Sequence, residues 1–134
     1  MNFGRLPLLV LLALLTFSCK SSFDDIVEYE TVAQINDFSV PDSAPSASIP
    51  IHIAGLIGKT TASSFKSVFY QRTDSLFEFA VYGRLVDKYN EVYVTKDITF
   101  DTTLVILTNP PRTGRHIFLI YGNNGTFADT CRLF

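Results

Sequence analysis

Past residue 25 the chain shows no helical periodicity, and this feature limits the possible folds more than any other. Apolar and polar residues alternate in short runs instead. Ile49, Ile51 and Ile53 alternate with other residue types, and so do the apolar residues of Leu76–Tyr82. Alternation with a period of two is typical of half-buried β-strands, whose successive side chains point to opposite faces of a sheet. The pattern therefore predicts a domain built from strands.

Clusters of Pro, Gly, Ser and Asn mark the turns between these strands. The turn segments are Val40–Ser48, Arg72–Ser75, Asn109–Gly114 and Gly122–Gly125. The expected strands are Thr31–Phe38, Ile49–Ala54, Phe65–Gln71, Leu76–Tyr82, a short Tyr93–Thr95, Thr102–Leu107, His116–Tyr121 and Phe127–Phe134. About seven main strands joined by short turns predict an all-β fold, an immunoglobulin-like antiparallel β-sandwich. One such domain spans residues 28–134.

Three residues are expected in the core between the two sheets. Ile51 and Phe79 are the middle members of alternating apolar sets, and Leu119 is central in the most apolar strand. Because His116–Tyr121 is nearly all apolar, it is predicted to be a central strand covered on both faces. Pro50 has no N–H to donate to a neighbouring strand, so we expect it at the start of its strand or on an edge.

The first 19 residues form a separate unit. Leu6–Phe17 is an apolar run too short to span a bilayer, and Arg5 precedes it, as in the core of a signal peptide. The small Ser18 then leads into Cys19. This segment resembles a bacterial lipobox, although Thr16 stands where that pattern has leucine. The resemblance implies a signal peptide of residues 1–18 and a Cys19 that carries acyl chains such as palmitate.

Two acyl chains anchor a protein stably, at about 0.8 kcal/mol per buried CH₂. A secretory peptide cleaved by the ordinary peptidase is the main alternative, although no A-x-A-like site lies close by. A buried helix of a soluble protein would need polar residues at helical spacing, which Leu6–Phe17 lacks.

Residues 19–27 are expected to be the lipidated cysteine and a polar tether. Within it, Asp24 and Asp25 resemble the acidic stretch that marks surface-exported lipoproteins of the Bacteroidota. This implies an outer-membrane, lipid-anchored protein exposed at the cell surface. A plain solvated linker, and a domain that faces the periplasm, remain open.

The domain itself is similar to a recurrent Ig-like domain of Bacteroidota lipoproteins. The similarity rests on Ser64-Phe65 before the turn at Arg72, on Val81-Tyr82-Gly83, and on the approach to the Gly122-Asn123 hairpin. Such domains often have a tyrosine two residues after the glycine that precedes the penultimate strand, whereas here the residue is His116. The resemblance implies a fold and a cellular location but no activity.

Charge and motifs exclude several classes of function. The formal net charge is −2 and the charges are scattered, so no concentrated positive field is present for nucleic acid. No Cys/His cluster has the spacing of zinc ligands, and neither a metal nor a cofactor is expected. Asp97 and Asp101 are about 13 Å apart on a strand that rises ~3.3 Å per residue, so we interpret them as a solvated face. Turn formation explains Asn123 and Asn124.

No enzyme is expected. His52 and His116 are the only histidines, and neither lies in a motif for nucleophilic or metal-dependent catalysis. Both are therefore interpreted as structural. If Cys19 carries lipid, Cys131 is left without a partner and is interpreted as a small core residue.

Three Asp-Ser/Thr-apolar/Thr triplets resemble the acceptor motif for protein O-glycosylation in the Bacteroidota. The acceptor positions are Ser43, Ser75 and Thr102. Ser43 is the preferred candidate because its Pro-rich loop should be accessible.

The expected function is non-catalytic: an accessory or scaffold subunit, anchored to the membrane by lipid, that contacts another cell-envelope protein. The alternative is a surface lipoprotein that captures a ligand, chiefly a glycan, beside an outer-membrane transporter. A glycan platform would use exposed aromatic side chains. Tyr70, Tyr82, Tyr89 and Tyr93 are available for this, but the chain has no tryptophan.

Overall fold

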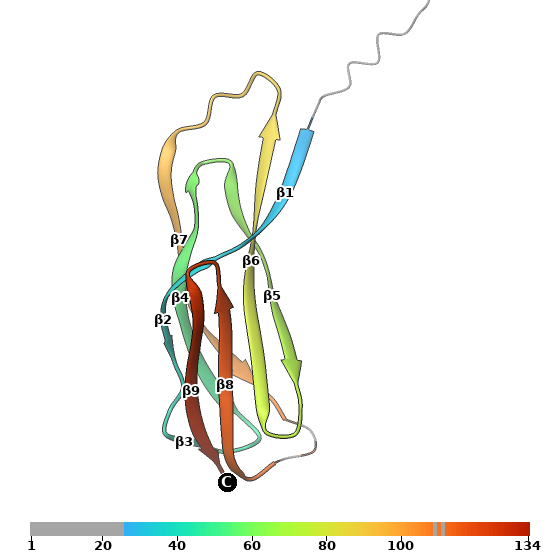
Figure 1. Cartoon of the computed structure of the whole chain (residues 1–134), viewed down its shortest axis with the longest axis vertical. Helices are drawn as coiled ribbons and strands as arrows, with labels where there is room; N and C mark the ends of the chain where they lie inside the picture. The colour runs from blue at the N-terminus through green and yellow to red at the C-terminus, as the bar shows by residue number, and fades with distance from the viewer. Residues whose placement is uncertain (1–25, 109, 111) are drawn as a thin grey trace, which may run out of the picture.

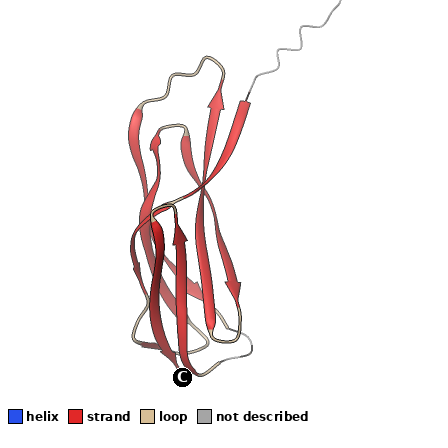
Figure 2. Cartoon of the chain, viewed as in Figure 1, coloured by secondary structure: helices blue, strands red, loops and turns tan. Residues whose placement is uncertain are grey.

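The computed structural model describes residues 26–134 apart from 109 and 111, and in this range it contains nine strands and no helix (Figures 1 and 2). The strands pack as two sheets over one core. Their bounds are β1 Ile26–Val32, β2 Gln34–Ser39, β3 Ser43–Ala44, β4 Ile49–Thr60, β5 Ser63–Arg72, β6 Leu76–Lys88, β7 Thr95–Ile106, β8 Gly114–Gly122 and β9 Gly125–Leu133. The predicted all-β sandwich is confirmed.

Strand β6 organises the larger sheet, whose six strands are β1, β3, β5, β6, β8 and β9. One edge of β6 pairs with β5 over Phe77–Leu85. Its other edge pairs with β8 over Leu76–Ala80 and then with β1 over Tyr82–Lys88. Strands β9 and β3 continue the sheet beyond β8. The smaller sheet has the order β2-β4-β7.

The strands differ from the predicted set in number and direction. The expected strand Thr31–Phe38 is divided at Ala33 into β1 and β2, and the two-residue β3 is additional. Tyr93 lies outside any strand, whereas β7 runs unbroken from Thr95 to Ile106. Of the seven strand pairings in the described range, β6–β8 and β3–β9 are parallel and five are antiparallel. Pro50 is the second residue of β4 and is exposed, as expected near the start of a strand.

At Ala33 the chain passes from the larger sheet to the smaller one. The Ala33 N–H donates to the Val81 carbonyl of β6 at 2.8 Å, and the Ala33 carbonyl accepts from the Asn123 N–H at 3.0 Å. Ala33 is completely buried. One continuous segment therefore joins both sheets, and its crossing point is held by backbone hydrogen bonds.

The core confirms two of the three predicted residues and corrects the third. Ile51 and Phe79 are completely buried between the sheets. Leu119 is only half-buried and faces outward, whereas Phe118 and Ile120 are completely buried. The prediction was wrong because β8 is apolar on both faces, so its alternation does not reveal which face is inside.

The two faces of β8 also differ from expectation. Its inner face is covered: the Phe118 ring stacks on the Phe77 ring with centroids 4.5 Å apart. Its outer face is open, with Ile117 45% and Tyr121 38% exposed. The prediction that β8 is covered on both faces is therefore wrong for the described part of the chain.

Side chains from β9 and its hairpin occupy the free edge of β2. Asn124 accepts a hydrogen bond from the Ile35 N–H at 3.0 Å and donates to the Ile35 carbonyl at 2.7 Å. Asp129 accepts from the Val40 N–H at 2.8 Å. This edge is thus closed to other strands.

Candidate functional site

An apolar surface covers the outside of the larger sheet, and we call it the outer apolar face. It consists of Phe69 on β5, Leu76 on β6, and Ile117, Leu119 and Tyr121 on β8. The strand register brings these residues together, since Phe69 and Tyr121 flank the same residue of β6, Ala80. Leu76 lies directly opposite Ile117.

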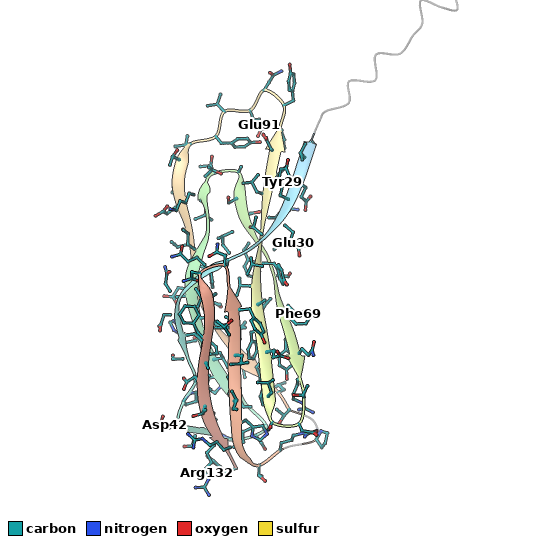
Figure 3. The ribbon with its side chains drawn as sticks, in the orientation of Figure 1. Tyr29, Glu30, Asp42, Phe69, Glu91 and Arg132 are labelled. Carbon is teal, nitrogen blue, oxygen red and sulfur yellow. The ribbon has the colours of Figure 1, made fainter. Side chains whose placement is uncertain are left out.

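The outer apolar face is exposed to solvent on β5 and β8, where Ile117 and Tyr121 are also exposed. Phe69 is 46% exposed and projects from β5 away from the sandwich (Figure 3). Ala80, between Phe69 and Tyr121, is only 4% exposed because its larger neighbours shield it. Scattered exposed apolar residues are normal, whereas contiguous exposed apolar groups are typical of contact surfaces.

A polar contact also lies within this face. The Tyr121 hydroxyl donates a hydrogen bond to the Glu78 carboxylate of the neighbouring strand β6. That hydrogen bond raises the pKa of the Tyr121 phenol. The contact satisfies the hydroxyl group, while the side chain remains 38% exposed.

The edge of β5 borders the outer apolar face. In the described range β5 pairs only with β6, so the backbone groups of its other edge have no strand beside them. A bulge between Phe65 and Ser67 interrupts the first part of the strand. The remaining six residues, Ser67–Arg72, contain no proline, glycine or acidic residue. Proline within the strand is one of the features that protect natural edge strands, and its absence here leaves this segment able to pair with another strand.

The aromatic side chains of the inner face stop at this same edge. The Tyr70 and Phe79 rings stack with centroids 5.3 Å apart, and the next pair inward, Phe79 and Phe118, are 6.4 Å apart. Tyr70 remains 40% exposed because no strand lies beyond it. Partial burial raises the pKa of the Tyr70 phenol. A strand added to β5 would cover Tyr70 on one face of the sheet and Phe69 on the other.

The outside of the smaller sheet carries a different arrangement, a histidine held between two carboxylates. His52 Nδ1 lies 3.0 Å from Asp37 Oδ2, and His52 Nε2 lies 2.8 Å from Asp101 Oδ1. Asp37 and Asp101 are brought there by register, because both lie opposite Ala54 on the central strand β4. The hydrogen bond to Asp101 is the main cause that raises the pKa of His52.

This Asp37–His52–Asp101 clasp joins all three strands of the smaller sheet. Because the two carboxylates occupy opposite nitrogens of the ring, they do not converge on one point where a metal could sit. Among the described residues no group of three metal-ligating side chains is suited to a metal ion. Asp101, which the sequence analysis interpreted as solvated, is thus exposed but hydrogen-bonded to His52. No local motif signals this site, since its members are separated by 15 and 49 residues.

His116 and Cys131 are placed as structural residues. His116 is 3% exposed, its Nδ1 lies 3.1 Å from the Gly114 carbonyl oxygen, and its ring lies 5.6 Å from that of Phe77. It thus bonds the backbone at the start of its own strand, as a corner residue does. Cys131 is 1% exposed, and burial raises the pKa of its thiol.

The predicted modification sites fall in three different settings. Ser43 is exposed but begins strand β3 instead of lying in a loop, since it pairs with Arg132. Ser75 is exposed in the turn between β5 and β6. Thr102 is half-buried within β7. Cys19, the predicted lipidation site, lies outside the described residues, as do Asp24 and Asp25.

The four tyrosines do not form one platform. Tyr70 lies on the inner side of β5, whereas Tyr82 lies on the outer side of β6. Tyr89 and Tyr93 belong to the loop between β6 and β7, where the Tyr93 hydroxyl accepts a hydrogen bond from the Lys88 N–H. A flat sugar-binding surface made of all four is therefore not present.

Comparison of the chain with protein-family models, with curated proteins and with solved structures gave no match. In the part of the chain that the structure describes, no helix is long and apolar enough to cross a membrane.

Proposed function

We propose that this protein is a non-catalytic subunit of the bacterial cell envelope, anchored by lipid at Cys19, that contacts another envelope protein. The observation that carries the proposal is β8, a strand apolar on both faces of which only one is covered. An apolar outer face with an unpaired edge beside it is the surface that a protein partner would cover.

The partner that fits this surface best is an extended segment of another protein, paired with Ser67–Arg72. Its backbone would complete the edge of β5, and alternate side chains would contact Phe69 and Tyr70. Arg72 has no ion pair among the described residues, so a carboxylate on the partner strand would complement it.

A second copy of the chain fits less well. A two-fold antiparallel pairing that places Phe69 opposite its counterpart also places Lys66 opposite Arg72, because each is three residues away. Like charges directly opposite on paired strands are destabilising. We therefore assign the edge to a different protein.

Site-specific crosslinking in the native host tests the contact. A photoreactive phenylalanine analogue at position 69 should give one adduct of defined mass, and Ile117→Glu in the same protein should remove it. Thr103→Glu, on the outside of the smaller sheet, is the matched control and should preserve the adduct. An adduct with twice the mass of the chain, or none in intact cells, would overturn the assignment.

The anchor is tested separately. Cys19→Ala should release the protein from membranes in soluble form, because no acyl chain could be attached. The measurement is the fraction that sediments with membranes after a high-salt wash. Unchanged sedimentation would show that lipid is not what holds the protein there.

The alternative function, capture of a glycan at the cell surface, is favoured by a different observation. A groove with two arginines lies at the end of the larger sheet, where it borders the outer apolar face at Ile117.

A further inference from the structure

Two arginines lie directly opposite each other near the C-terminal end of the chain. Arg115 on β8 pairs in register with Arg132 on β9, and both are exposed. Like charges in this position destabilise a strand pair, so the arrangement carries a cost for the fold. Among the described residues neither arginine has an ion-pair partner within 4.0 Å. Arg115 does donate a hydrogen bond to the Thr130 hydroxyl at 3.3 Å, which turns it toward β9.

A groove of about 570 Å³ adjoins this arginine pair. Volumes of this order accommodate a small ligand. Gly114 lies at the groove with φ 100°, a backbone conformation that favours glycine, and a Cβ built on it would meet nothing within 4 Å. The lining residues of the groove are Asp42, Gly114, Arg115, Thr130, Cys131 and Arg132.

Asp42 supplies the one carboxylate of the groove. Its backbone carbonyl accepts a hydrogen bond from the Arg132 N–H at 2.9 Å, so its position relative to Arg132 is fixed by the backbone. Both residues lie at one end of the molecule (Figure 3), the end at which Figure 1 marks the C-terminus. The Asp42 carboxylate is not within 4.0 Å of either guanidinium. It therefore leaves their donors free.

These groups together specify the chemistry of a ligand. Guanidinium groups bind a carboxylate through paired, charge-assisted hydrogen bonds. Asp42 repels an anion but accepts hydrogen bonds from hydroxyl groups. We propose that the groove binds a hydroxylated carboxylate, as found in a uronic acid, with the carboxylate on Arg115 and Arg132 and a hydroxyl on Asp42. This site borders the outer apolar face at Ile117, but strand β6 separates it from the edge of β5.

Calorimetric titration of the detergent-solubilised full-length protein with D-glucuronate tests the site at low ionic strength. D-glucose, which lacks the carboxylate, and inorganic phosphate, which lacks the sugar hydroxyls, should each bind more weakly. Arg115→Gln and Arg132→Gln should each weaken glucuronate binding about tenfold or more, because a hydrogen bond to a charged group is lost. Arg84→Gln, beside Glu28 on another part of the sheet, is the matched control and should have no effect.

Asp42→Asn tests the proposed hydroxyl contact separately from the carboxylate contact with the arginines. Phosphate should bind this variant as tightly as it binds the wild type, or more tightly, since a negative charge is removed. The preference of the protein for glucuronate over phosphate should be lost. The melting temperature of the arginine variants should be equal to or above that of the wild type, because like-charge repulsion is relieved. A melting temperature at or above that of the wild type also establishes that the variants are folded.

An oligogalacturonide titrated in parallel identifies the source of the sugar acid. Binding at least as tight as that of glucuronate assigns the site to a polysaccharide, whereas binding of the monosaccharide alone assigns it to a free sugar acid. The proposal is overturned if wild-type protein binds glucose or phosphate as well as glucuronate, binds none of them, or is unaffected by Arg132→Gln. Phe69→Glu should leave the titration unchanged, so failure of the protein contact and failure of this site are distinguishable.

Discussion

The two sheets of the sandwich present opposite kinds of outer surface. On the smaller sheet the outward residues of β7 are chiefly polar, and His52 is held there between two carboxylates. On the larger sheet the outer apolar face exposes Phe69, Ile117 and Tyr121. An antiparallel sheet needs only one apolar face to fold, with the other solvated. The smaller sheet, which is antiparallel throughout, follows that rule, and the apolar outer surface of the mixed larger sheet is what supports the proposed contact with a partner.

The largest expected effect is the difference in lost stability between truncating a core phenylalanine and truncating one on the outer apolar face. Phe79→Ala should destabilise the domain by about 3–5 kcal/mol, because a completely buried ring is removed. That is a large part of the ~5–15 kcal/mol that holds a small domain folded. Phe69→Ala should cost about 1 kcal/mol or less, as a surface change does. Urea unfolding of the two variants makes the comparison, and equal losses would show that the outer apolar face contributes to the core.

A second pair tests the two faces of one strand. Ile120→Ala should cost about 2–5 kcal/mol, since Ile120 is completely buried, and Ile117→Ala about 1 kcal/mol or less. The same urea measurement applies. If Ile117→Ala proved the more damaging, the inward face of β8 would have been assigned to the wrong residues.

The next effect concerns the edge of β2, which the Asn124 side chain caps. Asn124→Ala removes both hydrogen bonds to the Ile35 backbone and should cost about 1–3 kcal/mol. Asn123→Ala is the matched control in the same turn. Asn123 bonds to the Ala33 carbonyl, just before β2, through its backbone N–H, which the substitution retains. A midpoint of unfolding that is equal in both variants would mean that the edge of β2 does not depend on its side-chain cap.

The smallest expected effect is a dependence of stability on pH at His52. Because its pKa in the folded protein is raised, the charged imidazolium stabilises the fold fully below the unfolded pKa of about 6.5. That stabilisation is lost as pH rises through the folded pKa. The difference in unfolding midpoint between wild type and His52→Gln should therefore be larger at pH 5.5 than at pH 8.5.

Asp97→Asn is the control for His52, as Asp97 lies on β7 outside the clasp. Its unfolding midpoint relative to wild type should not follow the same trend. A His52→Gln protein whose deficit grows with pH would contradict the clasp.

Local pattern in the sequence accounts for the strands and for part of the core. The alternation around Ile51 and Phe79 contains enough polar residues to show which side faces inward, and both predictions are confirmed. It fails at Leu119, where apolar residues occupy both phases of β8. The position of an outer face without a covering layer depends on how the sheets stack, which no single strand encodes.

Most of the candidate sites could not be predicted from patterns in the sequence. The pairing of β6 with β8 is parallel and joins residues about forty positions apart, so no turn signal predicts it. The same holds for the approach of Asp37 and Asp101 to His52, which follows from register across three strands. Arg115 and Arg132 are the exception in principle. The Gly122–Gly125 turn sets the β8–β9 register, and counting outward from that turn pairs these two residues.

The crossing of the chain at Ala33 has a mechanical consequence. Strand β1 begins toward the end of the molecule away from the C-terminus (Figure 1), so tension applied at its start acts along the axis of β1. The seven residue pairs between β1 and β6 are bonded across that axis, and such a ladder is loaded in shear, with its bonds sharing the force. Behind it, Ala33 passes the remaining load into the second sheet. A domain pulled from its N-terminal side would therefore resist as one body instead of unzipping strand by strand.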